Sequence, residues 1–225
     1  MAKIPFREQV LHAREGALIA SVNRLLAEKG YEAMTVDEVA ADVGIAKASL
    51  YKHFGSKEAL AAAAMVRVLD NALQFLAQLE ADGTGGAVER LKAVVRWTMQ
   101  VQLAGEMPAL PAQNSSLRTA LAANKGYLDR LVRVSDKLGE WIVAAQQAGQ
   151  LNRDLPSEVI LYTFFARACD PVLGLLKAAG QYTDERIIEC LIATTFEGIG
   201  AGPRAPLMAP TAAIPAPRKR SRRSA

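Results

Sequence analysis

The sequence is poor in the residues that disulfide frameworks, metal sites and catalytic centres use. Its 225 residues include two cysteines and two histidines, and aromatic residues make up 6% of the chain. Cys169 and Cys190 are too few for a disulfide framework, and each lies in an apolar helical pattern that is typical of a buried thiol. Two histidines and two distant cysteines give no metal-ligand spacing. We therefore predict no metal site and no cofactor.

Catalytic and phosphate-binding motifs are also missing. The chain has no Gly-x-x-x-x-Gly-Lys-[Ser/Thr] loop and no Gly-x-Ser-x-Gly elbow. His12 and His53 have no nucleophile nearby in the sequence that would make either of them a general base. We expect no enzyme and no catalytic residue. An enzyme on an all-α scaffold is kept as an alternative, and a lack of specific DNA binding would favour it.

Long hydrophobic runs are absent as well. The longest purely apolar stretch, Ala59–Val66, has about eight residues, whereas a membrane-spanning helix needs about 20. The N-terminus, Met-Ala-Lys-Ile-Pro-Phe-Arg, has no hydrophobic segment of a secretion signal. We therefore expect a cytoplasmic protein that has no membrane partner.

The residues that are present favour a folded chain whose charge is unevenly distributed. Hydrophobic residues make up 51% of the chain and charged residues 22%, which excludes a wholly disordered protein. The net charge is +4, and residues 201–225 alone carry six basic side chains and no acidic ones. Residues 1–60 carry eight of each sign, and residues 61–200 carry 13 basic and 15 acidic side chains. Net charge therefore gives no argument that the folded part binds nucleic acid.

Hydrophobic periodicity predicts an all-α protein of about nine helices and no sheet. The first helix runs from about residue 7 to 29 and ends at Gly30, a residue that suits the left-handed conformation after a helix. The second begins at Thr35, where Thr35-Val-Asp-Glu38 has the pattern of a capping box, and it ends at Gly44. A third short helix covers about 47–53, and Ser56 caps a long fourth helix.

The rest of the chain continues in the same way. Further helices are expected at about 87–105, at 116–148 as a pair with a break at Gly126, at 157–179, and at 183–198. Pro171 should kink the helix at 157–179, because proline removes a backbone donor. Five prolines and no periodicity follow Gly200, which predicts a disordered tail.

Two short helices joined by a glycine turn and braced by a longer helix form the helix-turn-helix pattern. The second short helix would enter the major groove of DNA. It carries small residues that let the backbone approach bases, together with lysines and hydrogen-bonding side chains for phosphates: Lys47, Ala48, Ser49, Tyr51, Lys52 and His53. Lys57 follows at the start of the fourth helix, where free N–H groups and the helix dipole favour an anion.

The segment from Thr35 to Leu60 resembles the DNA-binding domain of the TetR/AcrR family of bacterial transcriptional regulators. The string Leu-Tyr-x-His-Phe-x-Ser-Lys-Glu, which is residues 50–58 here, carries most of the likeness, and Gly30-Tyr31 and Thr35 also match. The resemblance implies an all-α homodimer that binds a palindromic operator in double-stranded DNA. It also implies a C-terminal domain with a small-molecule pocket and the dimer interface, and usually repression that ligand binding relieves.

The resemblance also carries roles onto single residues. Four would contact phosphates: Thr35, Tyr51, His53 and Lys57. Three would lie near base edges: Lys47, Ala48 and Ser49. Lys52 would serve either role, and four residues belong in the core: Val39, Leu50, Phe54 and Leu60. One departure is visible, because the family usually has Ser or Thr where this chain has Ala46, and alanine cannot cap a helix.

The C-terminal part of the chain is expected to bind a ligand and a second copy of the protein. Large, adaptable side chains between the fourth and eighth helices are candidates for the pocket wall: Trp97, Met99, Leu103, Met107, Tyr127, Trp141, Phe164 and Phe165. Three arginines lie within apolar helices, and one that pointed inward would favour an anionic ligand group: Arg96, Arg133 and Arg167. The last two helices carry long apolar stretches that suit a dimer interface.

We therefore predict three units. Residues 1–56 form a helix-turn-helix DNA-binding domain, residues 57–200 a ligand-binding and dimerisation domain, and residues 201–225 a disordered basic tail. The predicted function is a repressor that an unknown small-molecule effector releases from its operator. The alternative is a constitutive or architectural DNA-binding protein that has no ligand response, in which the basic tail adds affinity.

Overall fold

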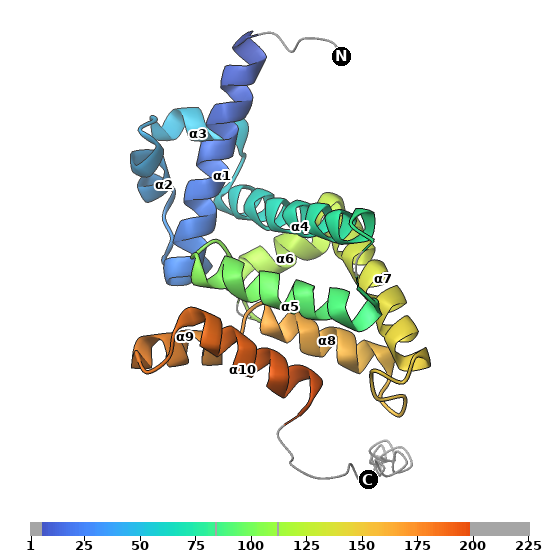
Figure 1. Cartoon of the computed structure of the whole chain (residues 1–225). Helices are drawn as coiled ribbons and strands as arrows, with labels where there is room; N and C mark the ends of the chain where they lie inside the picture. Colours follow the sequence, from blue (N-terminus) through green and yellow to red (C-terminus); the bar gives the residue numbers. More distant parts are fainter. Residues whose placement is uncertain (1–5, 84, 112, 199–225) are drawn as a thin grey trace, which may run out of the picture.

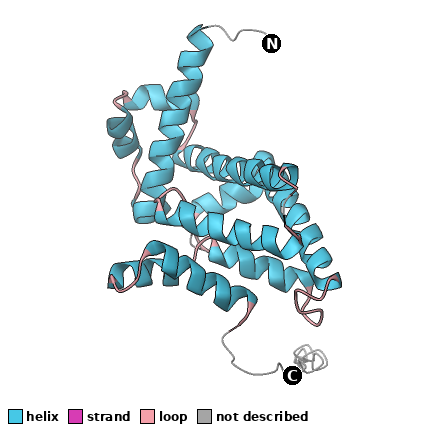
Figure 2. Ribbon diagram, viewed as in Figure 1, coloured by secondary structure: helices cyan, strands magenta, loops and turns pink. Residues whose placement is uncertain are grey.

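The computed structural model describes residues 6–83, 85–111 and 113–198, and all regular structure in these ranges is helical (Figure 2). The predicted all-α class is confirmed. The predicted tail, residues 201–225, lies outside the described residues. The described residues form these helices: α1 (Phe6–Ala33), α2 (Val36–Val43), α3 (Lys47–His53), α4 (Lys57–Ala81), α5 (Ala87–Leu103), α6 (Ser116–Ala123), α7 (Lys125–Gln147), α8 (Ser157–Arg167), α9 (Pro171–Ala179) and α10 (Asp184–Phe196).

Helices α1 to α3 form one end of the molecule, and we call them the reading head (Figure 1). The long helix α4 leads from the head into a bundle of the remaining helices, in which it packs against α7 and α6. Helix α5 packs against α7 and α10, and α8 packs against α7 and α5. The head and the bundle are therefore joined through α4, which belongs to both.

The ends of the first helices follow from local chemistry, as the sequence predicts. Gly30 has a φ of 74° and interrupts α1, and Gly44 closes α2 with a φ of 69°. Both values lie in the left-handed region, where a Cβ would be strained. The hydroxyl of Ser56 caps α4 by accepting the N–H of Ala59 at 3.1 Å. These ends set the short α2–turn–α3 unit against α1 and α4.

Two predictions about the later helices are wrong: the proline kink at Pro171 and the helix break at Gly126. The helix expected at 157–179 is two helices, because the carboxylate of Asp170 accepts the N–H of Val172 at 2.9 Å and starts α9 with Pro171 in its first turn. Proline therefore begins a helix here and does not kink one. The break between α6 and α7 lies at Asn124 and not at Gly126, because the Asn124 side chain accepts the N–H of Tyr127 at 2.9 Å.

The described residues bury two hydrophobic cores. The first lies in the reading head and contains the predicted core residues Val39, Leu50 and Leu60, with Phe54 packed against it. Leu117 and Leu121 of α6 belong to this same core. The second core fills the bundle between α4, α5, α7, α8, α9 and α10. Helix α6 is thus packed into the head although it follows α5 in the chain.

The two cysteines differ in their surroundings. Cys169 is half-buried, whereas Cys190 is exposed on α10. The prediction of a buried thiol is therefore wrong for Cys190. The buried face of α10 is formed instead by four other side chains: Ile187, Ile188, Leu191 and Ile192.

Two helical segments are, by length and composition alone, apolar enough to cross a membrane: Lys57–Ala81 and Ser157–Ala179. This is weak evidence, since the core helices of soluble proteins pass the same test. In this fold the first segment is α4, which packs against α1 and α7. The second segment is interrupted where α8 ends and Asp170 caps α9.

Candidate nucleic-acid interface and ligand cavity

The capping box at the start of α2 uses the hydrogen-bonding groups of Thr35. Its hydroxyl accepts the N–H of Glu38 at 3.2 Å and donates to Glu38 Oε2 at 2.9 Å. Its backbone N–H donates to the same carboxylate oxygen at 2.9 Å. These bonds, together with one from Lys29, lower the pKa of Glu38 to about 2, and the lysine contributes most. The predicted phosphate ligand Thr35 is therefore already part of a closed local network.

A tight turn brings α3 across the end of α2. The N–H of Ile45 donates to the carbonyl of Ala40 at 3.0 Å. Helix α3 then starts at Ala46, which gives no side-chain hydrogen bond to the helix end. The sequence predicts that Ala46 cannot cap α3, and the structure confirms this.

Helix α3 is held by one fully buried side chain, Leu50, and presents the rest of its surface to solvent. Six of the predicted DNA-contacting residues are exposed on it: Lys47, Ala48, Ser49, Tyr51, Lys52 and His53. A short helix that is anchored at one point and open elsewhere has the shape that a major groove accepts. The structure thus brings these six predicted residues together on one element.

The three lysines of this region differ in their partners. Lys47 Nζ lies 2.8 Å from Asp37 Oδ2 in an exposed ion pair, which raises the pKa of Lys47. Lys57 Nζ lies 4.3 Å from the ring centroid of Tyr31 and 3.4 Å from the carbonyl oxygen of Glu32. Lys52 has no ion-pair or hydrogen-bond partner within the described residues. Lys52 is therefore the lysine of α3 that is free to meet a phosphate.

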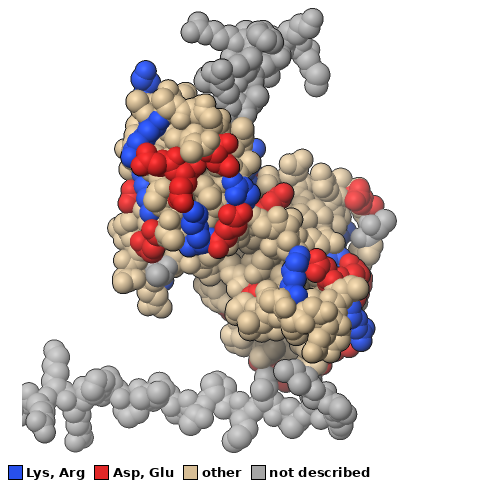
Figure 3. All heavy atoms as spheres, turned by 90° about the vertical axis from the view of Figure 1, so that its left-hand side faces the viewer, with Lys and Arg blue, Asp and Glu red and all other residues tan. Residues whose placement is uncertain are grey.

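The reading head has no surface of a single charge sign on the face that Figure 3 presents, where Lys and Arg alternate with Asp and Glu. Arg24 pairs with Asp42 at 2.7 Å, and Lys29 pairs with Glu38 at 2.6 Å. Such exposed pairs add little stability. Residues 1–60 carry equal numbers of basic and acidic side chains, and several of these form local ion pairs. The overall charge of this region therefore gives no attraction to DNA, and any contact would depend on individual side chains and helix ends.

An apolar cavity of about 450 Å³ lies between α4, α5, α7 and α8. Five of the eight predicted pocket residues line it: Trp97, Met107, Tyr127, Phe164 and Phe165. The other three, Met99, Leu103 and Trp141, are not in its wall. Met99 is fully buried in the bundle core and Trp141 is 5% exposed. Met99 follows Trp97 by two positions, which places it on the opposite side of the helix.

The largest contribution to this wall comes from α4, which the sequence pattern did not identify as part of the pocket. Met65, Val68, Leu69, Ala72, Phe75 and Leu76 line the cavity. Their spacing of three and four residues is the signal of one helix face, but that spacing alone does not distinguish a cavity wall from packed core.

The polar groups of the cavity wall are few and uncharged. Burial raises the pKa of the Tyr127 hydroxyl and of the Cys169 thiol, so both keep their protons at neutral pH. The Thr98 hydroxyl is used by the carbonyl of Val95 at 2.8 Å. None of the three arginines considered for an anionic group lines this cavity. Arg96 pairs with Glu185 and Glu189, Arg167 pairs with Asp170, and Arg133 is exposed.

The α1–α3 unit, with its glycine turn and its exposed third helix, defines the helix-turn-helix class of DNA-binding transcriptional regulators. The family model of bacterial regulatory proteins of the tetR family matches residues 18–64, which extend from α1 into α4. Over these residues the chain matches the DNA-binding part of the TetR family. The predicted resemblance to this family of transcriptional regulators is confirmed.

Curated relatives of two kinds support this match: some share about a third of the chain, and others share most of it. YerO of Bacillus subtilis, a helix-turn-helix transcriptional regulator, is 33% identical over 75 residues, which are 33% of this chain and 26% of YerO. The activator FasR of Mycolicibacterium smegmatis is 34% identical over 82 residues, which are 36% of this chain and 37% of FasR. The chain thus spans 26% of the length of YerO and 37% of the length of FasR. The repressor KstR2 of Mycobacterium tuberculosis is 23% identical over 192 residues, covering 84% of this chain and 94% of KstR2.

Solved structures share the whole fold at low sequence identity. The regulator FadR of Bacillus subtilis in complex with stearoyl-CoA aligns with a TM-score of 0.60 and 19% identity, over 82% of this chain and 99% of FadR. AibR in complex with isovaleryl coenzyme A and operator DNA aligns with a TM-score of 0.54 and 21% identity, over 81% of this chain and 98% of AibR. Both show that the head and the bundle together form a known architecture.

Proposed function

We propose that this protein is a cytoplasmic repressor that binds a palindromic operator as a homodimer and leaves it when an apolar small molecule fills the bundle cavity. In this proposal residues 1–56 read DNA, and residues 57–200 bind the ligand and the second copy. The observation that carries the proposal is the course of α4. Its first residue, Lys57, lies beside the reading head, and six of its later residues line the apolar cavity.

A ligand regulates DNA binding only if it binds one conformation of the protein better than the other. The side chains from Met65 to Leu76 line one wall of the cavity, so a ligand that displaces this wall displaces α4. Because the same helix begins in the core of the reading head, its displacement changes the position of α3. In a dimer this changes the distance between two recognition helices, which an operator fixes at about 34–36 Å.

The chemical class of the ligand follows from the side chains that line the apolar cavity. The cavity is apolar and its polar groups are neutral hydroxyls and a thiol, so it suits a hydrocarbon chain and not a charged group. Two proteins of the same fold were solved with acyl-coenzyme A ligands. We infer that the apolar part of this protein's effector is an acyl chain.

The second copy is proposed to bind at α8 and α9. Their outward surface and the loop that follows carry five large apolar side chains that are between 41% and 69% exposed: Val159, Tyr162, Val172, Leu175 and Tyr182. Apolar surface of this kind is typical of protein contacts. By contrast, the apolar residues of α10 are used in the bundle core. Leu175→Glu should convert the dimer to a monomer in analytical ultracentrifugation, whereas Leu128→Glu on α7 should not.

The DNA contacts remain proposals for each residue. Lys47, Ala48 and Ser49 are assigned to base edges, and Tyr51, Lys52, His53 and Lys57 to phosphates. Thr35 is assigned to a phosphate as well. Its hydroxyl has one proton, which Glu38 accepts, so this contact requires the Glu38 carboxylate to give way to the DNA.

One experiment tests the proposal and its alternative. An operator is first selected from random duplexes with the purified protein, and decanoyl-coenzyme A is then titrated into the complex. Release of the DNA supports a ligand-responsive repressor, and undiminished binding supports the constitutive alternative. In the Ala72→Phe variant the larger side chain should fill the apolar cavity. The variant should still bind the operator, but the ligand should no longer release it. Ala77→Phe is the matched control, because Ala77 is exposed on the same helix.

A further inference from the structure

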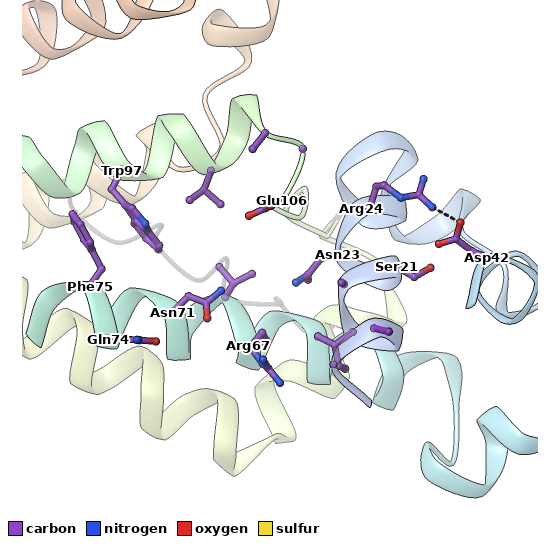
Figure 4. Close-up of a pocket in the computed structure, with 18 of the residues that line it drawn as sticks. Ser21, Asn23, Arg24, Asp42, Arg67, Asn71, Gln74, Phe75, Trp97 and Glu106 are labelled. Atoms are coloured by element: carbon purple, nitrogen blue, oxygen red, sulfur yellow. Dashed lines mark ion pairs between the residues drawn. The ribbon is translucent and has the colours of Figure 1, made fainter. Parts of the chain in front are cut away.

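A second space lies outside the apolar cavity, at the junction of the reading head and the bundle (Figure 4). It has a volume of about 1030 Å³ and is bounded by α1, α4, the end of α5 and the end of α2. We call it the junction cleft. Unlike the apolar cavity, it is lined by charged and amide side chains, of which six matter here: Asn23, Arg24, Arg67, Asn71, Gln74 and Glu106.

The two spaces share a wall. Val68, Phe75 and Trp97 line both the junction cleft and the apolar cavity. The rings of Phe75 and Trp97 stack with their centroids 5.1 Å apart, and Figure 4 shows the two rings meeting between α4 and α5 at one end of the cleft. This stacked pair therefore forms part of the partition between the two spaces.

Asn23 is a buried polar residue at the cleft. Its side chain points from α1 into the cleft (Figure 4), the residue is 9% exposed, and its Oδ1 has no hydrogen-bond partner within the described residues. Burying an amide oxygen without a partner costs free energy. A ligand that offers an N–H or O–H donor in the cleft would remove this cost.

Arg67 is the cation of the cleft that has no partner. Arg24 is engaged by Asp42 at 2.7 Å and by Glu28 at 3.1 Å. Arg67 lines the cleft from α4 and has no ion pair or hydrogen bond in the described part of the chain. Asn71 and Gln74 line the cleft from the same helix, about one and two turns further along (Figure 4). A guanidinium with amides nearby is suited to a carboxylate or a phosphate.

We propose that the junction cleft binds the anionic end of the effector whose apolar chain fills the cavity, with Arg67 as the anchor and Phe75 and Trp97 as the partition between the two parts. This inference rests on the proposed function. The apolar cavity has no charge in its wall, so an ionised group would be expensive to bury there, and the cleft is the adjoining space. The ligand class is an amphipathic molecule with one hydrocarbon chain and one anionic end group.

This location makes the end group a direct link between the two parts of the protein. Asn23 and Arg24 belong to the reading head, whereas Arg67, Asn71 and Gln74 belong to α4. A ligand that spans them contacts both sides of the junction. The effector would therefore act on the head through the cleft as well as through the movement of α4.

Calorimetric titration of the full chain with three probes of equal chain length tests the proposal: decanoyl-coenzyme A, decanoate and methyl decanoate. Arg67→Gln should weaken binding of the two anionic probes about tenfold and leave the uncharged ester unchanged. Arg118→Gln is the matched control, because Arg118 is exposed on α6 and lines neither space. If Arg67→Gln weakens binding of decanoate alone, the end group is a carboxylate. If it weakens binding of decanoyl-coenzyme A alone, the end group is a phosphate. Either result supports the proposal.

The outcomes separate this proposal from the proposed function. If Arg67→Gln binds both anionic probes like the wild type, while Ala72→Phe binds none, the cleft proposal is wrong and the apolar ligand stands. If the wild type binds none of the three probes, both are wrong. A second variant, Asn23→Leu, should raise the thermal stability of the free protein, because it removes an unpartnered amide oxygen. It should also weaken binding of decanoyl-coenzyme A, whose amide and hydroxyl groups can donate to that oxygen. A gain in stability with unchanged binding would exclude Asn23 from the site.

Discussion

The hydroxyl of Tyr31 donates a hydrogen bond of 2.7 Å to Glu58 Oε1 and so joins the end of α1 to the first turn of α4. Ser116, the first residue of α6, donates to the same carboxylate oxygen at 2.9 Å. These bonds, that from Tyr31 foremost, lower the pKa of Glu58 to about 2, and burial raises the pKa of Tyr31 to about 12. One carboxylate therefore connects the reading head, α4 and α6.

Tyr31→Phe should destabilise the protein, because it removes the strongest hydrogen bond to this carboxylate and leaves the ring in place. A hydrogen bond to a charged group contributes about 1.5–3 kcal/mol, and partial exposure of the site reduces the expected loss to about 1–2 kcal/mol. Urea denaturation followed by circular dichroism measures this loss. Tyr51→Phe is the control, since Tyr51 is 43% exposed and its hydroxyl has no hydrogen bond in the described residues, and equal effects of the two changes would contradict the prediction.

Stability should fall in acid because of Glu58. Its pKa in the folded protein is about 2, below the ordinary value of 4.5. A depressed carboxylate pKa adds stability that is fully present above about pH 4.5, and this stability is lost as the pH falls towards 2. Glu58→Gln should therefore lower the free energy of unfolding at neutral pH and flatten its slope between pH 5 and pH 2.

Glu158→Gln is the control for this pH dependence, because Glu158 is an exposed glutamate of α8 with no bond in the described part of the chain. It should leave the slope as it is in the wild type. Glu38 contributes a slope of the same sign, since its pKa is also lowered to about 2, so the Glu58→Gln variant should retain part of the acid dependence. A Glu58→Gln profile parallel to that of the wild type would show that this carboxylate has no such role.

Local chemistry made the helix ends of the reading head predictable. The capping box of Thr35 and Glu38 and the left-handed Gly44 depend on residues within a few positions of each other. The later ends were harder, because Gly126 and Pro171 are stronger breakers in the sequence than the residues that form the caps, Asn124 and Asp170. A proline in the first turn of a helix and a proline inside one look alike until the cap is known.

The ligand site was predictable as a region and not as a set of residues. Trp97 and Met99 are both large and adaptable, but only Trp97 faces the cavity, because the choice depends on where α4 and α8 lie. The junction cleft could not be predicted at all. Asn23 and Arg67 are far apart in the sequence, and each has the pattern of an ordinary helical residue. Their relation arises only when α1 packs across α4.

Ala46→Ser should strengthen the start of α3. Alanine gives no side-chain bond there, whereas a serine hydroxyl can accept a backbone N–H of the first turn. A cap contributes about 0.5–2 kcal/mol, so thermal stability or operator affinity should rise. Ala41→Ser, an exposed change on α2, is the control. Thermal melts and operator titrations that show no change or a loss in both quantities would reject the prediction.

Lys52→Ala should weaken operator binding and reduce its salt dependence. Lys52 has no competing partner in the described residues, so its full charge is available to a phosphate. Removing one phosphate contact lowers the slope of log affinity against log salt by about 1. Lys47→Ala should have the smaller effect on this slope, because Lys47 first has to leave Asp37. Fluorescence anisotropy with a labelled operator at several salt concentrations measures both slopes.

Deletion of residues 204–225 should weaken DNA binding more at low salt than at high salt. This segment contains Arg204 and the five basic residues of 218–223, and it has no acidic residue, while the reading head is neutral overall. Basic side chains that meet phosphates release counterions, so the loss of affinity depends on salt. The same anisotropy titration on the full chain and on the truncated chain compares the two slopes. If the slopes are equal, the tail makes no phosphate contact, and the +4 charge of the chain has no part in operator binding.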